Sequence, residues 1–144
     1  MTIKIRVVRT LKEVRTRLRD IAAAQHSNAA AQRDRSARDL QDEHATLQTA
    51  LNQAASTLAE ARTVHDLDRV AEDTGVHRLS VADAAKRHEV ALAASQTTAD
   101  HLRERTRQLR TAERLVELAN ARRAKRESRA EQRRTDDMTA RRPR

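Results

Sequence analysis

Residues that break a helix are almost absent from this sequence, which has one glycine and one proline among 144 residues. Turns depend on such residues, because glycine reaches backbone angles that other residues avoid and proline ends helices. The chain also has no aromatic residue and no cysteine, so it lacks the usual material for a thick core, for disulfides and for thiolate metal sites. We therefore expect a few long, thin helices that meet along a narrow line of contact, called the seam below.

Apolar residues recur at alternating steps of four and three, which is the pattern of a coiled coil. The first run, called the N-terminal stripe, consists of Val7, Leu11, Val14, Leu18 and Ile21. A second run begins at Leu40, and a third extends from Val81 to Leu109. The N-terminal stripe is out of phase with the second run, which indicates a stutter between them.

Two signals near the middle of the chain predict a bend. Gly75 can close a helix in the left-handed conformation, and Ser80 with Asp83 matches a capping box that opens the next helix. The predicted fold is all-α, a single long antiparallel two-helix coiled-coil hairpin over residues 1–144. Its expected parts are helix 1 over about 4–74, a bend at 74–80 and helix 2 over about 81–140.

A bend at this place would pair residues whose numbers sum to about 154, and so bring His65 near His88. A functional pair is conceivable, but two histidines without further ligands make a poor metal site. We therefore interpret His65 and His88 as polar residues that the seam tolerates. The same pairing sets the N-terminal stripe against residues 120–144, where Met138 is the one strong apolar residue. The stripe therefore needs a partner from outside the chain, unless it packs loosely on arginine stems.

Charge is segregated along the chain. Residues 1–35 carry a net charge of +6, residues 36–100 carry −5 and residues 101–144 carry +8. A hairpin gathers both basic ends at one end and leaves an acidic bend at the other. Acidic proteins, nucleic acid and anionic membranes are candidate partners for such basic ends. Specific nucleic-acid binding is not expected, because no aromatic side chain can stack on bases and acidic residues interrupt the basic ones.

No pattern in the chain carries catalytic chemistry. A single glycine cannot build a phosphate-binding loop, and thin helices give carboxylates no pocket that excludes water. We expect a non-enzyme with no catalytic residue, no cofactor and no metal. The N-terminus lacks the apolar run of a signal peptide, and no stretch approaches the roughly 18 apolar residues of a membrane span. The expected location is the cytoplasm, without membrane insertion.

Two stretches resemble the FliJ/YscO family, the stalk proteins of flagellar and injectisome type III secretion. Residues 8–15, VRTLKEVR, run into an alanine-rich stretch at 22–25, much as the first helix of the family does. Residues 131–141, EQRRTDDMTAR, are similar to its C-terminal stretch, in which a basic pair precedes an acidic pair. The absence of aromatic residues near the bend departs from flagellar members and favours the injectisome branch.

The resemblance implies a stalk that inserts its terminal end into a hexameric secretion ATPase and presents its bend to the cytoplasmic domain of the export gate. Such a protein associates peripherally with a membrane export apparatus, and it can also handle export chaperones. The resemblance assigns ATPase binding to Val7, Leu11, Val14, Leu18, Arg133, Arg134, Asp137 and Met138. It assigns gate binding to Val64, Leu67, Val76 and Leu79.

Two other functions stay open at this point. One is a generic coiled-coil scaffold that dimerises through the N-terminal stripe. The other is a non-specific nucleic-acid-associated protein, whose affinity would have to persist at physiological salt.

Overall fold

A computed structural model describes residues 5–60 and 63–140. It contains two helices, α1 (Ile5–Glu60) and α2 (Val64–Ala140). They pack against each other as a helical hairpin, which confirms the predicted all-α fold class. The expected start of helix 1 at residue 4 lies outside the described residues, as does Arg141 of the C-terminal stretch.

The bend lies earlier than the sequence indicated. Helix α1 ends at Glu60 and α2 begins at Val64, so the prediction of a bend at 74–80 is wrong. A capping box starts α2 at Thr63 and Asp66. The Thr63 backbone N–H donates to Asp66 Oδ2 at 3.1 Å, and the Asp66 N–H donates to Thr63 Oγ1 at 3.2 Å. These reciprocal bonds satisfy two backbone donors that a helix start otherwise leaves unpaired.

Gly75, the residue expected to close a helix, lies inside α2 instead. No described glycine has a positive φ, so the conformation that only glycine adopts easily is not used there. Nothing lies within 4 Å of the position that a Cβ atom would take at Gly75. Continuous helical residues on both sides outweigh one glycine, which lowers helix stability by only about 1 kcal/mol.

Gly75→Ala should therefore stabilise the protein by about 0.5–1 kcal/mol, because alanine loses less backbone entropy in a helix and meets no neighbour here. Urea denaturation followed by far-UV circular dichroism measures the change. Loss of stability on this substitution would contradict the continuous helix and support a bend at Gly75.

The seam follows unbroken steps of four and three along both helices. In α2 the positions from Val70 to Ala119 that follow these steps are all buried or half-buried. In α1 the same rhythm extends from Val8 to Ala54, with Lys12 as the one exposed position. The expected stutter does not occur, because the seam in α1 passes beside the N-terminal stripe rather than along it.

The register of the hairpin follows from contacts between the helices. Ser36 Oγ lies 3.1 Å from His88 Nδ1, and His26 Nδ1 lies 3.3 Å from Thr98 Oγ1. In both pairs the residue numbers sum to 124, not to 154 as the misplaced bend predicted. His65 is consequently on the same helix as His88, about 35 Å away at ~1.5 Å per residue, and the expected histidine pair does not form.

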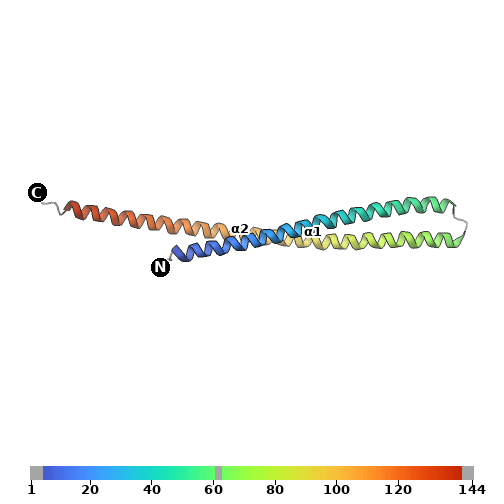
Figure 1. Ribbon diagram of the computed structural model, residues 1–144, viewed down its shortest axis with the longest axis horizontal. Helices are drawn as coiled ribbons and strands as arrows, with labels where there is room; N and C mark the ends of the chain where they lie inside the picture. Colours follow the sequence, from blue (N-terminus) through green and yellow to red (C-terminus); the bar gives the residue numbers. More distant parts are fainter. Residues whose placement is uncertain (1–4, 61–62, 141–144) are drawn as a thin grey trace. The chain divides into compact units, whose positions relative to one another are not determined.

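The chain divides into two compact units. The central unit comprises residues 24–100, in which the end of α1 lies beside the start of α2 (Figure 1). Its buried seam residues are small, namely Ala29, Ala84 and Ser95. Small side chains let two helices approach closely but fill little volume, so this seam is thin.

The terminal unit comprises residues 1–23 and 101–144. Both basic ends of the chain therefore belong to one unit, as the charge pattern predicted for a hairpin. Val8, Ala22 and Ala112 are its buried apolar residues. The end of α2 continues past the start of α1 in this unit (Figure 1), and residues 120–138 are all exposed.

Candidate docking surfaces

The N-terminal stripe lies on the side of α1 next to the seam and is mostly exposed. Val7 is 60% exposed, Leu11 37%, Val14 47% and Ile21 54%, whereas Leu18 is half-buried. A shallow hollow on this face is lined by Val7, Leu11 and Val14 together with Arg6 and Thr10. The stripe is thus uncovered within its own chain, but for a different reason from the one expected. It lies one residue out of phase with the seam, which α1 turns toward α2.

Polar residues take the place of the stripe in the terminal seam. Arg15 Nη1 donates to Gln108 Oε1, and Arg105 Nη1 donates to the same oxygen at 3.1 Å. Lys12 Nζ lies 3.8 Å from Glu113 Oε1. The Nε donor of Arg19 is buried and has no hydrogen-bond partner. This part of α1 therefore places charged side chains at seam positions, where Arg15 and Arg19 are half-buried, and leaves most of the apolar stripe exposed, which is unusual for a helix that packs against one neighbour only.

Helix α2 contributes two further apolar side chains in the same unit. Leu115 is 38% exposed and Leu118 is 55% exposed. In this register Leu115 lies two residues after Glu113, the partner of Lys12, so it lies at the level of Thr10, next to Leu11. Neither leucine was predicted to be a docking residue, because the misplaced bend set the stripe against residues 120–144.

The residues assigned to ATPase binding fall into two groups. Val7 lies opposite about residue 117, and Arg133 is 16 residues farther along α2, or about 24 Å at helical rise. Arg133, Arg134 and Asp137 are exposed, and Met138 is 74% exposed. The structure therefore separates these four residues from the stripe, and they do not form one continuous surface with it.

The segment of α2 from residue 120 to residue 140 is called the C-terminal extension. It carries seven basic and four acidic side chains. Arg123 Nε donates to Glu127 Oε1 at 2.6 Å, one turn along the helix. This hydrogen bond and the charge of Glu127 raise the pKa of Arg123. Such intrahelical pairs help to keep a helix formed where no second helix covers it.

The residues assigned to the export gate are also divided. Val64 and Leu67 lie in the first turns of α2, next to the bend, and are 73% and 46% exposed. Val76 and Leu79 are exposed too, but they lie about 14–22 Å farther along α2 than Leu67 and Val64. Leu58, in the last turn of α1, is 47% exposed and joins the bend set. Leu58 was not predicted to be a docking residue, because the expected helix 1 over about 4–74 placed it inside a helix and far from the bend.

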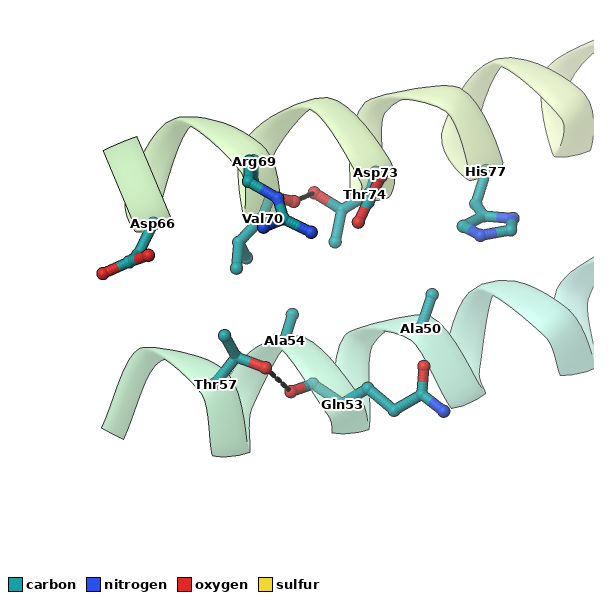
Figure 2. A pocket seen from close by; sticks show the side chains of 10 residues that line it. All are labelled: Ala50, Gln53, Ala54, Thr57, Asp66, Arg69, Val70, Asp73, Thr74 and His77. Atoms are coloured by element: carbon teal, nitrogen blue, oxygen red, sulfur yellow. Dashed lines mark hydrogen bonds between the residues drawn. The ribbon is translucent and has the colours of Figure 1, made fainter. Parts of the chain in front are cut away.

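A hollow between the helices lies close to the bend (Figure 2). Ala50 and Ala54 point from α1 toward Val70 and His77 on α2, and their short side chains leave open space. The hydroxyl of Thr74 is bonded within its own helix, to the carbonyl oxygen of Val70 at 2.9 Å. The hollow is thus explained by the small residues of the central seam.

Histidines occupy seam positions in the central unit without forming a ligand cluster. His26 and His88 each contact a hydroxyl group on the other helix. Within residues 5–60 and 63–140, no group of three or more histidine, cysteine or acidic residues is placed to hold a metal ion. Among these same residues, no helix has the length and apolar character needed to cross a membrane.

Comparisons with family models, with curated proteins and with solved structures give no match to this chain. The resemblance to the FliJ/YscO family therefore stays a prediction that depends on the two sequence stretches described above.

Proposed function

We propose that this protein is a non-enzymatic stalk that couples a hexameric secretion ATPase to the export gate of a type III secretion apparatus. The observation that carries the proposal is the terminal unit, which contains both an exposed apolar stripe and a basic helical extension whose residues 120–138 are all exposed. The positive charge of the terminal unit alone would be compatible with any polyanion as a partner. An apolar surface next to that charge is typical of a protein-binding site.

The division of the predicted ATPase site suggests distinct roles for its two parts. The C-terminal extension can enter a narrow ring because it is a single helix, about 10–12 Å wide. The stripe is on α1, and its Val7 lies opposite a point of α2 about 24 Å from Arg133. The stripe would therefore meet the rim of the ring or a protein bound there. At the bend, Leu58, Val64 and Leu67 are the exposed apolar residues that could contact the gate. Handling of export chaperones belongs to the same proposal.

Removal of residues 120–144 should abolish stimulation of the cognate secretion ATPase and leave the hairpin folded. The extension makes no seam contacts that stabilise the rest, since residues 120–138 are exposed. ATP hydrolysis by the purified ATPase, with and without added full-length or truncated protein, measures the effect. Circular dichroism of the truncated protein provides the folding control.

Charge reversal offers a sharper variant of this test. Arg133→Glu with Arg134→Glu should reduce stimulation at least tenfold, whereas Arg9→Glu, also exposed but on α1, should have a smaller effect. Full-length protein that neither binds nor stimulates the ATPase would refute the stalk function. A stripe-dependent dimer with no ATPase association would favour the scaffold alternative instead.

A further inference from the structure

We infer that the N-terminal stripe, with Leu115 and Leu118, binds an amphipathic helix of another protein whose apolar residues repeat at steps of four and three and whose flanking residues are acidic. This inference names the chemistry of the partner at one of the proposed docking surfaces and therefore rests on the proposed docking function.

The spacing of the stripe indicates a helical partner. Val7, Leu11, Val14, Leu18 and Ile21 repeat the four-three rhythm that two packed helices share. The same stretch of α1 already uses a second four-three face, through Val8 and Ala22, for its contact with α2. A helix with two such faces normally lies between two other helices. Among the described residues, α2 is the one helix that packs on α1, and the stripe side of α1 is mostly exposed.

Charge around the stripe indicates acidic flanks on the partner. Residues 5–23 carry six basic and two acidic side chains. Arg6 lines the hollow beside Val7, and exposed Arg17 lies within one turn of both Val14 and Ile21. On α2, exposed Arg114 lies one turn before Leu118. Glutamate or aspartate at the edges of a docked helix would pair with these guanidinium groups, whereas lysine or arginine would be repelled.

The same charges argue against the other candidate occupants. A second copy of this chain would bring basic edges against basic edges around the stripe. A lipid surface would contact a wider apolar face, usually with aromatic anchors. This stripe has only two apolar positions per heptad, and the chain has no aromatic residue. Nucleic acid would find phosphate partners in the arginines but nothing for the apolar residues.

Two matched probes test the inference with the full-length protein. The first is a fluorescein-labelled synthetic helix with leucine at four-three spacing and glutamate at the flanking positions. The second is the same peptide with lysine in place of each glutamate. Fluorescence anisotropy should show that the glutamate probe binds at least tenfold more tightly than the lysine probe. The difference should shrink as salt is raised, because exposed charges are screened.

Two pairs of substitutions locate the binding. Val7→Ser with Val14→Ser should weaken binding of the glutamate probe at least tenfold. Val90→Ser with Leu92→Ser changes apolar residues that are 71% and 39% exposed elsewhere on α2, and should leave binding unchanged. Circular dichroism should show both variants to be as helical as the parent protein.

Four outcomes would overturn the inference. These are equal binding of the two probes, binding that survives the stripe substitutions, a stripe-dependent homodimer in sedimentation equilibrium, and stripe-dependent binding to phosphatidylserine vesicles without probe binding. The result is independent of the ATPase assay. Probe binding without ATPase stimulation would refute the stalk function and retain the docking surface. ATPase stimulation without probe binding would retain the stalk function and refute the docking surface.

Discussion

Ala84→Glu should destabilise the hairpin by about 3 kcal/mol, because it places a carboxylate at a buried seam position without a built partner. Ala84 is only 1% exposed, which makes it the most deeply buried apolar residue among those described. The register places it beside Leu40, and Glu43 occupies the next seam position of α1, so a second carboxylate is close. Urea denaturation followed by circular dichroism measures the loss.

Ala85→Glu is the matched control, because it makes the same chemical change at the neighbouring exposed position. A surface substitution of this kind should change stability by no more than about 0.5 kcal/mol. Burial should also raise the pKa of the carboxyl introduced at position 84 above its unfolded value. Its destabilising effect is therefore full at neutral pH and should diminish as pH falls through that raised pKa. Equal effects of the two substitutions would show that the seam is not where the structure places it.

Composition and periodicity were sufficient to predict two long helices, but they did not locate the bend. The prediction rested on Gly75 and the Ser80–Asp83 box, and it passed over the similar pattern at Thr63 and Asp66. Two patterns of the same kind cannot be ranked by local chemistry alone, since either can cap a helix. What separates them is the length of seam that each bend allows both helices to share, which is a property of the whole pairing.

The docking surfaces were predicted in part for the same reason. Apolar spacing identified the N-terminal stripe, and the structure leaves most of it exposed. Spacing alone did not show which face of α1 meets α2, because the stripe and the seam differ by one residue. Continuing the rhythm backward from Leu40 reaches Ala29, Ala22 and Val8 without a stutter. This continuous spacing can be read from the sequence. It passes through Arg33, Arg19 and Arg15, however, and a pattern that accepts only apolar residues excludes these positions.

Arg19→Leu should stabilise the terminal unit by about 1–2 kcal/mol. Arg19 occupies a seam position, and its Nε donor is buried without a hydrogen-bond partner. A buried donor of this kind costs about 1–3 kcal/mol. Its Nη2 pairs at 3.0 Å with Asp20, the next residue on the same helix, so that ion pair contributes nothing to the contact between the helices. Leucine would remove the unsatisfied donor and add apolar area to the seam.

Arg17→Leu provides the matched control for this substitution, because Arg17 is exposed on the same turn of α1. It should change stability by no more than about 0.5 kcal/mol. If α1 instead turned its stripe toward α2, Arg19 would lie on the outside, and the two substitutions would have equally small effects. Thermal and urea denaturation of both variants therefore reports which face of α1 forms the seam. That face decides whether the stripe is free to bind a third helix.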